Sequence, residues 1–287
     1  MNVPADNPAK TGQEQAGAAA SSRNLWLRLA AAAVLIPLTL GLAWLGGWWW
    51  LVLVSLVGIG LFIEWLTLVG APRERGIAAG GVALVVAAAC VLMDRHDSAI
   101  GILAVGAIVV AVLSMRQRIW ATAGFAYAAV AVFSAMALRG ETIIGFQALV
   151  FVLCVVWVTD TLGYFVGRNV GGAKLWPRVS PNKTWSGALG GFFGSLLVGA
   201  GFAFAGYIAW LPALLVSATL SVASQLGDLF ESAIKRRFGV KDSGQLIPGH
   251  GGLLDRLDGF VAAILVAVLI GLSRGGFDGV SRGLMLW

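Results

Sequence analysis

The chain has 287 residues, of which 59% are apolar and 12% charged, and its mean hydropathy is +0.86. About a quarter of the residues in an average soluble domain are charged, so this composition excludes an ordinary soluble globular protein. The net charge is +6, but the basic residues gather in particular loops. We therefore interpret the charge as membrane topology and expect no nucleic-acid partner. The two cysteines, Cys90 and Cys154, lie inside apolar runs, which predicts packing roles and no disulfide framework.

Residues 1–22 are polar, rich in alanine, glycine and glutamine, and have no periodic apolar pattern. This composition predicts a disordered cytoplasmic tail. The first apolar run follows Arg23 and lasts about twenty residues, which is longer than the core of a signal peptide, and no convincing cleavage site follows it. We expect this run to be retained as a membrane anchor.

Nine apolar stretches are long enough to span a bilayer, because a helix needs about 20 residues to cross roughly 30 Å of hydrocarbon. They predict an all-α fold, a polytopic integral membrane helix bundle of about nine transmembrane helices. In the seventh stretch the run of glycines from Gly187 to Gly194 favours close helix packing in lipid. The predicted spans are 25–45, 48–69, 76–93, 98–114, 119–138, 143–166, 187–207, 211–234 and 258–273.

The distribution of lysine and arginine predicts the orientation. With a cytoplasmic N-terminus, 16 of the 20 basic residues fall in cytoplasmic segments and only Arg95, Arg139, Arg274 and Arg282 fall outside. We therefore expect a multi-pass protein of a bacterial-type inner (plasma) membrane, with both long polar loops and the active site on the cytoplasmic side. The expected parts are the tail 1–22, an N-terminal transmembrane region 23–142 of about five spans, a catalytic transmembrane domain 143–275 with cytoplasmic loops 167–186 and 235–257, and a short non-cytoplasmic tail 276–287.

Four ionisable residues inside the predicted spans are informative: Glu64, Asp160, Asp228 and Glu231. A charge at mid-bilayer costs about 2.5–3.5 kcal/mol, so such residues face a protein cavity and usually have a function. Steps of three and four residues place a polar stripe on one face of the eighth span. A seam that joins helices is one reading, but paired carboxylates also suit Mg²⁺. For Glu64, an ion pair or snorkelling to the interface is as consistent as catalysis. The stripe contains Ser221, Ser224, Asp228, Glu231, Ser232 and Lys235.

The segment 232–259 concentrates charge beside the eighth span. It holds five basic residues, three aspartates, one histidine and six glycines. Carboxylates that hold Mg²⁺, cations that neutralise phosphate oxygens and glycines that allow close backbone approach are typical of a phosphate–metal site. For Arg237 we prefer an anchor to anionic lipid. His250 could bind phosphate, act as a general acid or base, or make a structural hydrogen bond. Capping of the ninth span is an alternative role for Asp255 or Asp258.

These residues resemble the signature of the phosphatidate cytidylyltransferases, or CDP-diglyceride synthases. The similarity extends to a second segment from Asp160 to Trp185, in which Gly163, Asn182 and Ser186 depart from the family pattern. It covers the chain from near Trp157 to the end of the ninth span, and the first five spans match in hydropathy alone. The matching signature positions are Ser232, Lys235, Arg236, Lys241, Asp242, His250, Gly251, Gly252, Asp255, Arg256 and Asp258.

The resemblance implies cytidylyl transfer from CTP to phosphatidate in the bilayer, which gives CDP-diacylglycerol and pyrophosphate. It implies Mg²⁺, as one or two cations, bound by Asp228, Asp242 and, more weakly, Asp255. The catalytic residues would be Asp242, Lys235, Arg236, Lys241 and His250. A homodimer is possible, and the sequence does not determine the oligomeric state. The expected substrate-binding residues are Asp160, Tyr164, Arg168, Lys174, Ser180, Lys183, Thr184, Ser224, Ser232 and Arg256.

Two other functions fit the sequence less well. A transporter of an anionic solute could use the same buried charges, but the polar residues cluster at one edge of the predicted membrane region and no inverted repeat is evident. A CDP-alcohol phosphotransferase is disfavoured because the segment Asp255–Gly259 lacks the continuation of that family's aspartate-rich motif.

Overall fold

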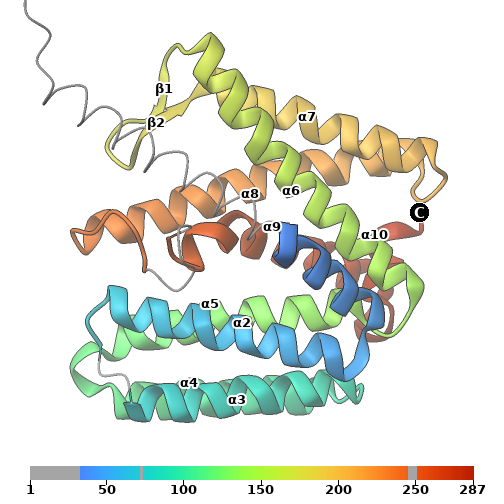
Figure 1. Ribbon diagram of the computed structural model, residues 1–287. Coiled ribbons are helices and arrows are strands. Elements are labelled where there is room, and N and C mark those ends of the chain that lie inside the picture. Colours follow the sequence, from blue (N-terminus) through green and yellow to red (C-terminus); the bar gives the residue numbers. More distant parts are fainter. Residues whose placement is uncertain (1–32, 72–73, 245–250) are drawn as a thin grey trace, which may run out of the picture.

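The computed structural model describes residues 33–71, 74–244 and 251–287. The described residues form a bundle of long helices with one short β-hairpin (Figure 1). A helix covers Ala33–Leu45. It is followed by α2 (Gly47–Leu68), α3 (Glu74–Leu92), α4 (His96–Leu113), η1 (Met115–Gln117), α5 (Arg118–Arg139), α6 (Ile143–Val170), β1 (Lys174–Trp176), β2 (Ser180–Thr184), α7 (Trp185–Phe204), α8 (Trp210–Arg237), α9 (Leu254–Gly275), η2 (Phe277–Gly279) and α10 (Val280–Met285).

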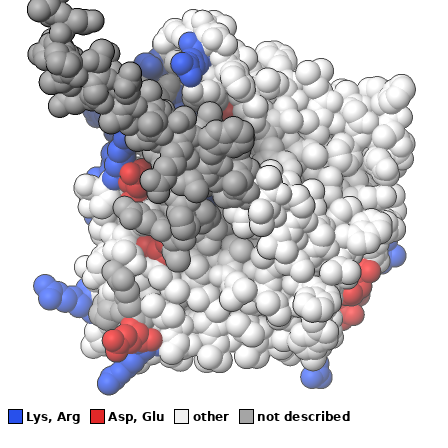
Figure 2. Space-filling view, viewed as in Figure 1, with Lys and Arg blue, Asp and Glu red and all other residues white. Residues whose placement is uncertain are grey.

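Among the residues that the structure describes, eight helices are long and apolar enough to cross a membrane, which confirms the all-α polytopic fold. They match the second to ninth predicted spans. The first predicted span, 25–45, is helical over Ala33–Leu45, and its earlier residues lie outside the described part of the chain. Figure 2 agrees with a membrane setting, because in this view the charged side chains gather toward the two ends of the long helices and the face between them is nearly uncharged.

Three helices extend beyond the predicted spans by three or four residues at one end. Helix α6 continues to Val170 and α8 to Arg237, while α9 begins at Leu254 and not at residue 258. An apolar run ends at the first charges, but the backbone hydrogen bonds of a helix continue into the polar interface. The polar loops are shorter as a result, and the hairpin of antiparallel strands β1 and β2 occupies much of the first one.

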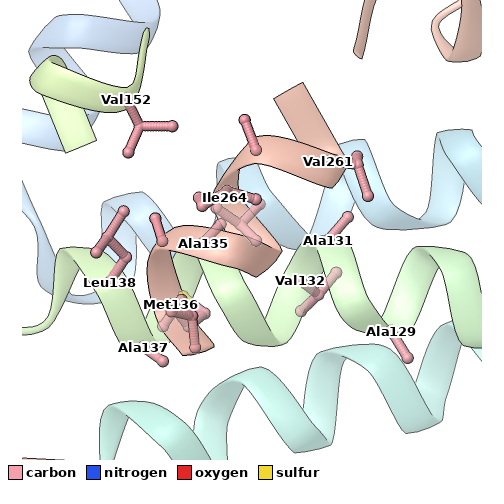
Figure 3. Packing of buried hydrophobic residues seen from close by; sticks show 14 of the residues in the cluster. Ala129, Ala131, Val132, Ala135, Met136, Ala137, Leu138, Val152, Val261 and Ile264 are labelled. Carbon is pink, nitrogen blue, oxygen red and sulfur yellow. The ribbon is translucent and has the colours of Figure 1, made fainter. Parts of the chain in front are cut away.

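The bundle has two groups of helices on either side of α9. Helices α2 to α5 pack together, α6 to α8 pack together, and α9 contacts α5, α6 and α8 (Figure 1). Figure 3 shows part of the buried core, where Ala131, Val132 and Met136 of α5 lie beside Val261 and Ile264 of α9. This apolar contact fixes α9 against the N-terminal group of helices.

Glycines bring α6 and α7 into close contact, as their sequence predicts. A Cβ atom on Gly187 would lie 2.6 Å from the carbonyl oxygen of Gly163, and one on Gly191 would lie 2.5 Å from that of Thr159. These two positions therefore require glycine, because backbone atoms cannot move aside as a side chain can. The close contact holds the hairpin and the polar end of α6 next to α8.

Candidate active site

A cavity of about 1210 Å³ opens inside the bundle and contains most of the charged residues described below. One part is polar and is formed by the C-terminal end of α6, the hairpin, α8 and the start of α9. The other part is apolar and is formed by the helix at Ala33–Leu45, α2, α5 and the middle of α6. The apolar part is lined by Leu35, Ile36, Trp50, Leu53, Val54, Val57, Ala131, Ala135, Leu149 and Leu153.

Three carboxylates from three helices face the polar part: Asp160 on α6, Asp228 on α8 and Asp258 on α9. All three line the same cavity, so a ligand there meets their combined negative charge. Lys183 of β2 forms an ion pair with Asp228, and Ser232 Oγ donates to Asp228 Oδ1 over 3.4 Å. The Lys183 and Asp228 side chains are 30% and 31% exposed, so a ligand in the cavity can reach this pair.

Lys235 lies between two further carboxylates. Its Nζ is 2.6 Å from Glu231 Oε2, one helical turn earlier, and 2.5 Å from Asp255 Oδ1 on α9. The three side chains are nearly buried, with 12%, 3% and 15% of their surface exposed. Asp255 Oδ2 also accepts hydrogen bonds from the backbone N–H groups of Ser243 and Gly252, each over 3.1 Å. Lys235 therefore ties α8 to α9 at the edge of the cavity.

The hairpin also supplies basic side chains to the cavity. Lys174 and Lys183 line the cavity, and so do Arg168 and Tyr164 from the end of α6. Arg168 Nη1 donates a hydrogen bond to the Tyr164 hydroxyl over 2.8 Å. Thr184 lines the cavity and also caps α7, because its Oγ1 accepts from Gly187 N over 3.1 Å. The cap orients β2 and thereby Lys183, its neighbour in sequence.

Comparison with known proteins identifies the family. The sequence model described as "Cytidylyltransferase family" matches residues 26–273, which is most of the chain. The chain belongs to this family. It is 43% identical over 257 residues to a protein of Brucella abortus named phosphatidate cytidylyltransferase, and the alignment covers 86% of this chain and 93% of the relative. A protein of the same name from Staphylococcus haemolyticus is 50% identical over 120 residues, 41% of this chain and 46% of the relative. The chain is therefore a nucleotidyltransferase.

In this cytidylyltransferase, many of the predicted site residues line one cavity. Those that do are Asp160, Tyr164, Arg168, Lys174, Lys183, Thr184, Asp228, Lys235, Asp255 and Arg256. Ser232 reaches the cavity indirectly through Asp228, and Ser224 is buried, 1% exposed, against Gly259 of α9. Ser180 is half-buried at the start of β2.

Other predicted residues lie away from the cavity. Arg236 donates to the carbonyl oxygens of Val179 and Val240, over 3.4 and 3.3 Å, and so supports the hairpin. Lys241 and Asp242 are exposed on the loop after α8 and do not line the cavity. The guanidinium of Arg237 lies 5.3 Å from the centre of the Trp120 ring. His250 lies outside the described residues.

Asp258 lines the cavity, although it is not among the catalytic, substrate-binding or metal-binding residues predicted from the sequence. The sequence allows capping as an alternative role for Asp258, but the residue lies in the second turn of α9, and its Oδ1 accepts from the N–H of its neighbour Gly259 over 2.7 Å. Asp255 and Asp258 are three residues apart, a spacing that places both on one helix face. That spacing could have indicated a shared cavity-facing role. The apolar wall from α2 and α5 could not be predicted from the sequence, because its residues are of the same types as those in any other apolar span.

Proposed function

We propose that this cytidylyltransferase transfers the cytidylyl group of CTP to phosphatidate, giving CDP-diacylglycerol and pyrophosphate, on the cytoplasmic side of a bacterial inner membrane. One observation carries the proposal: a single cavity has a charged part and an apolar part inside a helix bundle that can span a bilayer. Phosphatidate is an amphipathic substrate with a phosphate headgroup and two acyl chains. The names of the relatives point to the same substrate.

The charges of the cavity support a site for two phosphate-bearing substrates that also needs a cation. Lys174, Lys183, Arg168 and Arg256 line it and can neutralise phosphate oxygens. Asp160, Asp228 and Asp258 would repel the same phosphates. A divalent cation would resolve this conflict by neutralising negative charge, and Mg²⁺ prefers carboxylate and phosphate oxygens as ligands.

The donor set fits Mg²⁺ bound together with substrate. Among the described residues, no three acidic, histidine or cysteine side chains converge into a preformed metal site. Mg²⁺ commonly uses one or two protein carboxylates and completes its shell with water and substrate phosphates. Asp228, with Asp258 or Asp160, suits this role. Both oxygens of Asp255 already accept hydrogen bonds, and Asp242 does not line the cavity, which makes these two less suitable than the sequence predicts.

The proposed reaction needs positioning and charge neutralisation more than covalent catalysis. A phosphate oxygen of phosphatidate attacks the α-phosphorus of CTP, the bond from that phosphorus to the bridging oxygen breaks, and pyrophosphate leaves. Bound Mg²⁺ would neutralise charge on the phosphates. Lys183 and Lys174 on the hairpin would orient the polyphosphate, Arg256 at the start of α9 would contact a headgroup or phosphate, and the apolar wall would hold acyl chain.

The test is product formation by the full-length protein in detergent with labelled CTP, phosphatidate and Mg²⁺. We expect CDP-diacylglycerol only when all three are present, and we expect its loss on addition of EDTA. Asp228→Asn should lower kcat by about 10²-fold or more, as loss of a transition-state electrostatic group does. Asp278→Asn is the matched control, since Asp278 is exposed and does not line the cavity. Wild-type activity in Asp228→Asn would reject the site. CTP uptake into liposomes without product would indicate a transporter.

A further inference from the structure

Glu64 reaches the active-site region from the N-terminal half of the chain. It lies on α2 and is 2% exposed. Its Oε2 accepts a hydrogen bond from Leu254 N over 2.8 Å and another from Ser243 Oγ over 3.2 Å. These donors follow Glu64 by 190 and 179 positions and lie on the two sides of segment 245–250. One carboxylate therefore joins Ser243, in the loop after α8, to the start of α9.

Within the part of the chain that the structure describes, Glu64 has neither of the two structural roles expected from the sequence, an ion pair and snorkelling. Snorkelling would leave the carboxylate exposed at the interface, but the side chain is buried. Among the described residues, the ion pairs involve Asp228, Glu231 and Asp255, and none of them includes Glu64. The donors to Glu64 are a backbone N–H and a hydroxyl, which are the partners of a residue that holds chain segments in place.

The start of α9 depends on this contact. The first N–H groups of a helix have no partner within the helix and are normally capped by a side chain. The N-cap residue, Leu253, has no polar side chain, and Leu254 N is instead capped by Glu64. A negative charge at a helix N-terminus is also favourable because of the helix dipole. Glu64 thus supplies the cap that the local sequence lacks.

The packing around Glu64 leaves no room for a side chain at Gly244 or Gly252. A Cβ atom on Gly252 would lie 1.9 Å from Ser243 Oγ and 2.9 Å from both Glu64 Oε2 and Asp255 Oδ2. One on Gly244 would lie 2.8 Å from Glu64 Oε1. Two glycines of the charged segment therefore allow the backbone to approach Glu64 closely.

The contact continues to the cavity through Asp255. Ser243 donates its hydroxyl to Glu64 and its backbone N–H to Asp255 Oδ2, while Asp255 Oδ1 pairs with Lys235. Asp255 and Lys235 both line the cavity. A displacement of Ser243 or of the first turn of α9 would therefore move cavity-lining groups, although Glu64 itself is not among them.

We propose that Glu64 is a positioning residue for the transferase reaction: it clamps Ser243 and the N-terminus of α9 and so fixes the Asp255–Lys235 pair at the cavity. The proposal rests on the proposed function for its kinetic part and on the fold alone for the clamp. Removal of the carboxylate leaves a buried N–H and a buried hydroxyl without their acceptor. Misplacement of reacting groups by about 1 Å can lower a rate by about 10²-fold.

The experiment compares Glu64→Ala, Glu64→Gln and Glu74→Ala in the full-length protein in detergent. Glu74 is an exposed glutamate at the start of α3 and serves as the matched control. Hydrogen exchange of the peptide that contains Ser243 and Leu254 measures the clamp, and kcat and KM for CTP and phosphatidate measure its effect. In Glu64→Ala we expect exchange of this peptide to rise by about 10-fold or more. Its kcat should fall by about 10-fold to 10²-fold with both KM values within about threefold.

Glu64→Gln should rescue both readouts to within about threefold, because its amide oxygen can still accept from Leu254 N. Unchanged exchange in Glu64→Ala would overturn the clamp, and unchanged kcat would overturn the positioning role. If Glu64→Ala does not fold, Ser243→Ala takes its place. This variant removes only the weaker bond and should raise exchange and lower kcat by about two- to fivefold; wild-type values would overturn the proposal. If the wild-type protein makes no CDP-diacylglycerol, the proposed function fails, while the exchange data still decide the clamp.

Discussion

Replacement of Lys235 by methionine tests the most buried charge cluster of the described structure. The change keeps the length and apolar stem of the side chain but removes the charge that pairs with Glu231 and Asp255 at 2.6 and 2.5 Å. Because these carboxylates are only 3% and 15% exposed, water can replace the lost ammonium group only in part. Removal of one partner from a buried ion pair typically costs about 3–5 kcal/mol. We therefore expect Lys235→Met to lower the free energy of unfolding by about 3 kcal/mol or more.

The assay is denaturant unfolding of the purified protein in mixed micelles, with Lys174→Met as control. Lys174→Met is the same chemical change at an exposed position, so the unfolding free energy of this variant should differ from that of the wild-type protein by no more than about 0.5 kcal/mol. Adding Glu231→Gln to Lys235→Met removes one of the two unpaired carboxylates and should recover part of the loss. A loss below about 1 kcal/mol in Lys235→Met, or no recovery in the double variant, would refute the reasoning.

Three further predictions concern helix packing, capping and the apolar wall. Gly191→Val should lower the unfolding free energy by about 3 kcal/mol or more, because its Cβ would lie 2.5 Å from a carbonyl oxygen of α6. Gly201→Ala is the control, since a Cβ at Gly201 would meet open space. An equal loss in both variants would contradict the packing argument. Thr184→Val should cost about 1 kcal/mol by removing the cap of α7, with recovery in the serine variant; an equal loss with serine would argue against capping. Val57→Trp should raise KM for long-chain phosphatidate by about 10-fold and leave KM for CTP unchanged, because Val57 lines the apolar part of the cavity. Leu56→Trp is the control, since Leu56 lies on the exposed face of α2, and it should change neither KM. Equal effects of the two variants would contradict the assignment of the apolar wall to the acyl chains.

The transmembrane helices are predictable because their signal is local. A run of about 20 apolar residues determines a spanning helix wherever it occurs. The ends of α6 and α8 are not predictable in this way, because hydropathy ends at the membrane interface while helical hydrogen bonding continues to Val170 and Arg237. The hairpin was missed for a similar reason. Strands Lys174–Trp176 and Ser180–Thr184 are too short for an alternating pattern to be visible.

The candidate site was predictable where its partners share a helix. Glu231 and Lys235 are four residues apart, and the polar stripe of the eighth span contained both before their pairing was visible. The third partner, Asp255, lies beyond a loop, so its position depends on how α9 packs. The motif did not distinguish Asp242, which is exposed, from Asp258, which lines the cavity. Sequence spacing alone carries no information on which of two aspartates faces inward after a turn.

The family model also matches the N-terminal helices, so the prediction that they resemble the family in hydropathy alone is wrong, and the active-site region depends on them in three ways. They form the apolar wall of the cavity, α5 packs against Val261 and Ile264 of α9, and Glu64 of α2 caps the start of the same helix. The first two contacts require only apolar side chains of suitable size, so many sequences can supply them. The third requires an acceptor at one position, because a buried N–H and hydroxyl must be satisfied there. Glu64 is thus the position in α2 where a change of residue type should act directly on the geometry of the charged segment.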